Sequence, residues 1–145
     1  MYFLHGGLHL YDTGTKVQKH IFNNDRDVSI VDNVRRNLEQ GHFPLFVSEP
    51  THQKKLERIK HNPYLNHCYK SLKALSGALF IHGHSMAEND KHIFDQINSS
   101  NIEHVLVSIF GDEKSNANRE TIANARRFIS KEISFYNAVT APIWV

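Results

Sequence analysis

One short stretch of the sequence, residues 80–90, holds an unusual density of side chains that can bind or react. Gly83, at the expected end of a strand, lets the backbone approach a ligand closely because it has no side chain. Ser85 offers a hydroxyl group, and a helix that starts at Asn89 or Asp90 presents free N–H groups to a phosphate. The stretch predicts a nucleotide-binding loop. The alternative is an ordinary strand–helix turn in which Asn89 or Asp90 only caps the helix.

A second candidate is His5, which stands beside Gly6 at the start of an apolar segment. A histidine next to a nucleotide cleft can act as a general base because its pKa lies near neutrality. Alternatively, His5 satisfies a backbone carbonyl and has no chemical role.

Gly111 and Asp112 follow another apolar run. An acidic residue at the carboxyl end of a strand can accept hydrogen bonds from ribose hydroxyls, and it can equally well serve only to form a turn. We therefore include both residues in the predicted cofactor site, with the turn as the alternative.

Two histidines after the second apolar run raise the question of a metal site. His82 and His84 are two residues apart, so on a strand they face the same side. Further ligands would have to come from His9, Asp90 or Asp112. No zinc-motif spacing is present, and the single cysteine, Cys68, excludes a cysteine-ligated zinc or a disulfide within one chain. We predict no metal, and keep a metal-dependent hydrolase using His82 and His84 as a minor alternative.

Short apolar runs separated by helical segments must position these residues. The runs are residues 45–47, 78–81, 105–110 and 133–136. The helices are expected after Ser29, after Thr51, from Pro63, over residues 91–98, and after Ser115 or Asn116. This alternation predicts a mainly parallel sheet with flanking helices, in which the first three runs are neighbours and ligands bind beyond the carboxyl ends of the strands.

The segment before these runs predicts a β-hairpin. Apolar residues on both sides of residues 12–15, a turn-forming stretch, give the pattern, and a loop is expected at residues 23–25. The charged run at residues 54–58 is interpreted as a solvated helix face. Together the patterns predict a single α/β domain over residues 1–145 with a Rossmann-like sheet.

Composition limits the classes of protein. The chain has 145 residues, 40% of them hydrophobic and 22% charged, so neither a disordered nor a membrane-embedded protein is indicated. The formal net charge of +2 argues against a nucleic-acid partner. No signal peptide is evident at the start of the sequence, so we expect a cytoplasmic protein.

Four motifs carry a resemblance to known families. They are FLHGGLHLYD at residues 3–12, PLFVSE at 44–49, GHSMAEND at 83–90 and SIFGD at 108–112. The chain resembles an uncharacterised bacterial family of unknown function and, more distantly, sirtuin-like domains that bind or cleave NAD. The resemblance implies that His5 is the catalytic histidine. It also implies that NAD is held by a loop comprising Gly83, His84, Ser85, Asn89 and Asp90, and by Gly111 and Asp112.

Two departures from the sirtuin-like pattern shape the functional prediction. The four-cysteine zinc module of deacylases is missing, and so are the glycine-rich loop and Asn-x-Asp segment that precede the His-Gly pair in that pattern. We therefore expect the carboxyl-terminal portion of a longer sirtuin-like domain, NAD-hydrolysing when complete and inactive alone. The alternative is a non-catalytic nucleotide-sensing or assembly module. An open sheet edge would favour a homo-oligomer.

Overall fold

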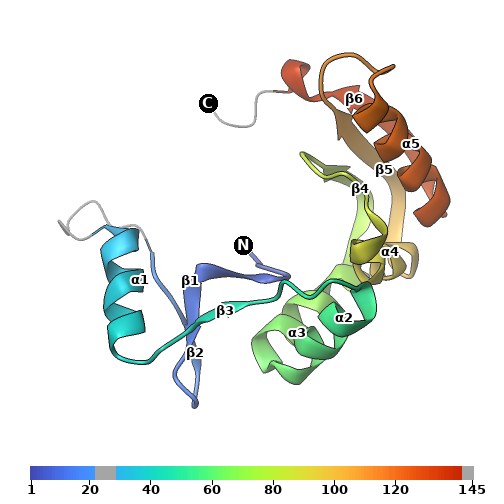
Figure 1. Ribbon diagram of the computed structural model, residues 1–145. Helices are drawn as coiled ribbons and strands as arrows, with labels where there is room; N and C mark the ends of the chain where they lie inside the picture. Colours follow the sequence, from blue (N-terminus) through green and yellow to red (C-terminus); the bar gives the residue numbers. More distant parts are fainter. Residues whose placement is uncertain (22–28, 142–145) are drawn as a thin grey trace.

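Two separate three-stranded sheets, joined by a pair of helices, organise the chain (Figure 1). The structure is a computed structural model that describes residues 1–21 and 29–141. One sheet has the strand order β2-β1-β3 and is antiparallel, and the other has the order β4-β5-β6 and is parallel. The α/β class predicted from the sequence is confirmed. The loop expected at residues 23–25 lies outside the described residues.

The amino-terminal sheet begins with the predicted hairpin. Strands β1 (Gly6–Asp12) and β2 (Val17–Lys19) pair antiparallel, with Tyr11 opposite Gln18. The turn between them is closed by Asp12, whose Oδ1 accepts a hydrogen bond of 2.8 Å from the backbone of Gly14. Helix α1 (Ile30–Glu39) follows, and its N-cap residue Ser29 accepts from the Asp32 amide as predicted.

The third strand, β3 (Pro44–Phe46), corrects one prediction. Residues 45–46 of the predicted run lie in this strand, but it pairs antiparallel with β1 and is not a neighbour of the parallel strands. The reason is a very close backbone approach at Gly6, which lies opposite Phe46 and has a φ of +76°. A Cβ atom built on Gly6 would lie only 1.9 Å from the carbonyl oxygen of Leu45. Only glycine permits this pairing.

The carboxyl-terminal sheet is the parallel one. Its strands are β4 (Ser76–Ile81), β5 (Asn101–Ile109) and β6 (Glu132–Asn137). Helices α4 (Lys91–Asn98) and α5 (Asn116–Phe128) form the crossovers, and Ser115 caps α5. The core of this unit consists of side chains from α4, α5 and one face of the sheet: Phe94, Ile97, Val105, Val107 and Ala125, among others. The prediction that the runs 78–81 and 105–110 form neighbouring parallel strands is confirmed, and the run 133–136 pairs in parallel with the second of them.

Helices α2 (His52–His61) and α3 (Pro63–Ser71) lie between the two sheets (Figure 1). Thr51 caps α2, and Pro63 is the first residue of α3, as predicted. A second, smaller core forms here from Val47, Ile59, Leu65 and Tyr69. Three short 3₁₀ turns complete the fold: η1 (Leu72–Ala74), η2 (Glu88–Asp90) and η3 (Ala138–Thr140). Among the described residues, no helix is long and apolar enough to cross a membrane.

The Gly6 contact gives the first testable prediction. We expect Gly6→Ala to destabilise the fold by roughly 2–4 kcal/mol, because a methyl group cannot occupy the space of the Leu45 carbonyl and the left-handed backbone adds strain. Urea unfolding measures the loss. Gly14→Ala is the matched control, because Gly14 has a φ of +82° but open space where the methyl group would lie, so only about 1 kcal/mol should be lost. Equal losses in the two variants would contradict the steric explanation.

Candidate functional site

Five polar side chains from separate segments meet beside the start of α4, and we call them the histidine–aspartate cluster. His5 comes from the residue before β1, Lys55 from α2, and His84 from the loop after β4. Asp90 is the last residue of η2, and His92 lies in the first turn of α4. The cluster thus joins both sheets and the connecting helices.

His5 is fixed by its backbone and by one side-chain contact. Its carbonyl oxygen accepts a hydrogen bond of 2.9 Å from the Val47 amide, just after β3. Its Nε2 atom lies 2.9 Å from Nε2 of His92, and 3.8 Å from Oδ1 of Asp90. The side chain keeps 30% of its exposure, so His5 is held from one side and open from another.

Asp90 is the centre of the cluster. Its Oδ1 accepts from Nζ of Lys55 at 2.7 Å, and its Oδ2 pairs with Nε2 of His84 at 3.2 Å. Asp90 occupies the N-cap position of α4, but its side chain makes no capping hydrogen bond, so the simple capping interpretation is wrong for this residue. Burial acts to raise the pKa of Asp90, but the hydrogen bond and charge of Lys55, with smaller effects from His5 and His84, outweigh it and lower that pKa. Asp90 is therefore a carboxylate at neutral pH.

The orientation of His84 is set by the loop that carries it. Its Nδ1 accepts a hydrogen bond of 2.9 Å from the backbone amide of Met86. Because Nδ1 accepts, the ring proton of neutral His84 must sit on Nε2, which then donates to Asp90. Met86 is fully buried and has a φ of +54°, which is strained for a residue with a side chain. The buried side chain holds this strained loop in place.

His92 is the most buried member, with 1% of its surface exposed. Its Nδ1 atom has no hydrogen-bond partner among the described residues, and its backbone carbonyl accepts from the hydroxyl of Tyr69 at 3.2 Å. Burial, followed by the charge of His5, lowers the pKa of His92 to about 4. His92 is therefore neutral at physiological pH.

The pKa of His5 is also lowered, chiefly by burial. Asp90 opposes this shift, whereas the charges of Lys55 and His84 add to it. Two neutral imidazoles whose Nε2 atoms face one another hold one proton between them, so one ring donates and the other accepts. This arrangement suits His5 for proton transfer at the exposed side of its ring.

The structure brings three of the predicted site residues together and places the others nearby or elsewhere. His5, His84 and Asp90 converge. Ser85 and Asn89 are exposed on the same loop. Gly83 does not offer its amide to a ligand, because that N–H donates to the buried hydroxyl of Ser108 at 2.8 Å.

Gly111 and Asp112 lie in the turn after β5. Asp112 accepts from the Lys114 amide at 2.9 Å and, through its carbonyl, from the side chain of Asn118. These are the contacts of a turn residue, and within the described part of the chain Asp112 makes no hydrogen bond to the histidine–aspartate cluster. The ribose contact of Asp112 stays a prediction.

The two histidines of the minor metal prediction turn to different partners. Nδ1 of His82 lies 3.0 Å from the hydroxyl of Tyr136 on β6, whereas His84 faces Asp90. The residues in the described part of the chain that offer ligand atoms close together are instead His5, Asp90 and His92.

Sequence reasoning missed Lys55 and His92. Lys55 stands in the charged run whose pattern indicates a solvated helix face, and this interpretation is wrong for Lys55, which is 8% exposed. A signal existed, because Lys55 precedes the buried Ile59 by four residues and therefore shares its face of α2. His92 gave no comparable signal.

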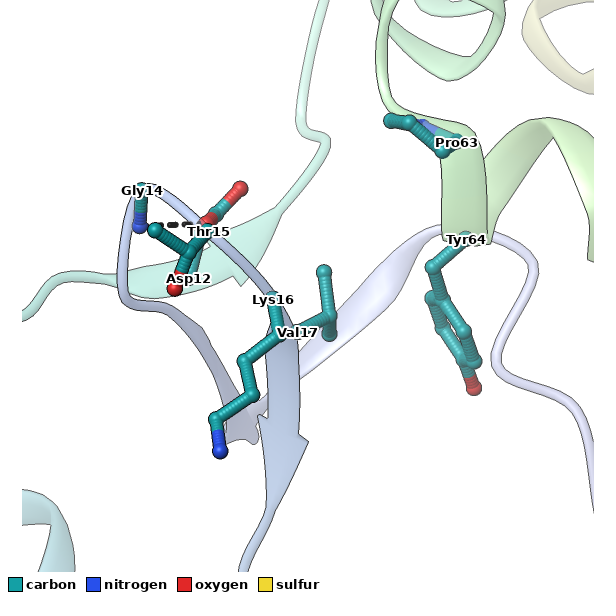
Figure 2. Close-up of a pocket in the computed structure, with 7 residues that line it drawn as sticks. All are labelled: Asp12, Gly14, Thr15, Lys16, Val17, Pro63 and Tyr64. Carbon is teal, nitrogen blue, oxygen red and sulfur yellow. Dashed lines mark hydrogen bonds between the residues drawn. The ribbon is translucent and has the colours of Figure 1, made fainter.

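A separate pocket of about 350 Å³ lies between the β1–β2 turn and the start of α3 (Figure 2). Its walls include Asp12, Lys16, Val17, Pro63 and Tyr64. In Figure 2 the Lys16 side chain points away from Tyr64, so the charged group does not face across the pocket. None of the predicted site residues lines this pocket.

Comparison with known proteins agrees with part of the sequence-based resemblance. The profile of a family described as a domain of unknown function (DUF4917) matches residues 1–144. No curated protein and no solved structure matches the chain.

Burial of neutral His92 predicts that acid destabilises the fold. His92 is faced by Asp90, Lys55, His5 and His52, and it accepts a proton in the unfolded chain near pH 6.5 but in the folded chain only at about 4. The contribution of neutral His92 to the free energy of unfolding is therefore fully present above pH 6.5. It is lost as the pH falls towards 4, which lowers the free energy of unfolding by about 1–3 kcal/mol.

Urea unfolding between pH 4 and 7.5, in EDTA, tests this expectation. His92→Gln should flatten the decline, whereas His104→Gln, which removes a half-buried histidine on β5, should leave it unchanged. The same slope in the natural chain and in His92→Gln would contradict the assignment.

Proposed function

The chain belongs to this family of unknown function, and we propose that it binds a nucleotide of the NAD class, with His5 as the acid–base group. One observation carries the proposal. His5 and Asp90, singled out separately in the sequence as a base and as a member of a nucleotide loop, lie together with Nε2 and Oδ1 3.8 Å apart.

The surroundings of His5 favour a chemical role over a structural one. A histidine that only stabilises the fold is usually buried with both ring nitrogens satisfied. His5 is instead 30% exposed, and its side chain makes one hydrogen bond within the described part of the chain. Lys55 neutralises much of the charge of Asp90, so Asp90 does not hold His5 in its protonated form. His5 is therefore available as a base at neutral pH.

The nucleotide is assigned from the loop and from the sirtuin-like resemblance. Ser85 and Asn89 are exposed beside His84 and Asp90, where their side chains are free to meet hydroxyl or phosphate oxygens. Helix α4 begins directly after Asp90, so its first amides lie next to the same place. These features support a nucleotide site, and the sirtuin-like resemblance favours NAD as the nucleotide.

The reaction proposed is hydrolysis of the bond between nicotinamide and ribose. Nicotinamide leaves with the electron pair of the C–N bond, the oxygen of water forms the new bond to the ribose carbon, and His5 takes the proton of that water. The products are nicotinamide and ADP-ribose, and the proton then passes from His5 to solvent. His92 holds the His5 ring in position through the contact between their Nε2 atoms. The carboxylate of Asp90 stabilises the positive charge that develops on the ribose.

Two assays on the complete natural protein test this function: NAD binding by calorimetry, and nicotinamide release. We expect His5→Gln to lower release by at least about 100-fold while binding changes little, because a general base contributes that much. His104→Gln serves as the control and should behave like the natural protein.

The outcomes separate the alternatives. Unchanged release in His5→Gln would remove the catalytic role of His5. Binding without release in every variant would identify a nucleotide-sensing module, and absence of binding would reject the nucleotide altogether.

A further inference from the structure

We propose that His5, Asp90 and His92 form a binding site for one divalent transition-metal ion, and that Zn²⁺ is the ion that fits it best. This site differs from the His82/His84 pair considered from the sequence. It goes beyond the nucleotide function and does not depend on it, because metal binding is measured without nucleotide.

The positions of the donor atoms carry the proposal. One ring nitrogen each of His5 and His92 and one carboxylate oxygen of Asp90 all lie within 4.8 Å of one another. The two Nε2 atoms are 2.9 Å apart, and Nε2 of His5 is 3.8 Å from Oδ1 of Asp90. Ligand atoms around a tetrahedral zinc ion stand about 3.3 Å apart, given bonds of about 2.0–2.1 Å. The two distances from Nε2 of His5 differ from this spacing by about 0.4–0.5 Å, so small side-chain shifts bring these donor atoms to the spacing of a zinc site.

The type of donor selects the ion. Two imidazoles and one carboxylate are the ligands of several hydrolytic zinc centres, which leave the fourth position open to water. Calcium and magnesium prefer a shell of oxygen atoms, so a site with two nitrogens disfavours them. The partly exposed side of His5 leaves room for the fourth ligand.

His92 provides an independent observation. It is buried, its Nε2 faces another ring nitrogen, and its Nδ1 has no partner among the described residues. A metal ion between the two rings would bind both Nε2 lone pairs at once, which a single proton cannot do. The proton of His92 would then sit on Nδ1 without an acceptor, and a missing outer hydrogen bond weakens metal sites by about 10–100-fold. We therefore expect micromolar rather than nanomolar affinity.

Lys55 competes for the same site. Its ammonium group lies 2.7 Å from Oδ1 of Asp90, and its side chain is only 10% exposed. A metal ion bound to that oxygen must displace the ammonium group or share the carboxylate with it, and like charges so close repel each other strongly. When no metal is bound, the Lys55 ammonium group thus balances the negative charge of Asp90.

Metal and proton exclude each other on Nε2 of His5. An ion held there fixes the remaining proton of His5 on Nδ1, so the ring no longer accepts a proton. If the proposed nucleotide chemistry is correct, Zn²⁺ inhibits it and EDTA restores it. This consequence rests on the proposed function, whereas the binding site itself does not.

Metal binding to the full chain is the test, measured first with Co²⁺ by its visible absorption and then with Zn²⁺ by competition with a chromophoric chelator. We expect one saturable ion per chain at micromolar concentration. His92→Gln and Asp90→Asn should weaken binding at least 10-fold, and Lys55→Met should tighten it at least 3-fold. His82→Gln is the control for a chain with eleven histidines and should leave binding unchanged.

The variants also decide against the proposal if it is wrong. Absence of saturable binding would overturn it, and so would equal affinity in the natural chain, His92→Gln and Asp90→Asn. If His92→Gln does not fold by circular dichroism, His5→Gln takes its place, because the His5 side chain is less buried. Loss of NAD binding with metal binding retained would reject only the nucleotide function.

Discussion

The ion pair between Lys55 and Asp90 is the contact on which the candidate site depends. It ties α2 to the start of α4, and both side chains are largely removed from water, at 10% and 15% exposure. Removing one partner of a buried pair leaves the other charge uncompensated, at a cost of about 3–5 kcal/mol in well-buried cases. The same pair fixes the carboxylate beside which His5, His84 and His92 are arranged. The same ion pair therefore stabilises the fold and positions the carboxylate of the candidate site.

Local patterns in the sequence predicted the helices and strands well, but they did not predict the pairing of every strand. Each apolar run became a strand, and the capping residues Ser29, Thr51 and Ser115 begin helices as expected. The prediction for strand β3 named the wrong sheet because a three-residue run contains no information about its pairing direction. The decisive feature was Gly6, whose missing side chain allows β1 and β3 to approach. That contact joins residues far apart in the sequence.

The site was predicted in part for a similar reason. His5, His84 and Asp90 were visible because they stand next to glycines or at the ends of elements, where polar residues are conspicuous. Lys55 and His92 were hidden inside helices, where a charged or polar residue normally faces water. Their burial arises from the packing of α2 against the η2 turn and α4, a tertiary contact. Gly83 was predicted to let the backbone approach a ligand, but its amide N–H donates to the hydroxyl of Ser108.

His5 and His92 share one proton through their Nε2 atoms beside a charged Asp90, and the proposed chemistry of the cluster requires this arrangement. Nitrogen-15 NMR of the histidine rings in the metal-free chain at pH 7 reports where each ring proton lies. We expect two neutral rings with a hydrogen-bonded Nε2 on each, and a His84 ring protonated at Nε2. Ring nitrogens of His5 and His92 that resemble solvent-exposed histidines in rapid tautomeric exchange would contradict the shared proton.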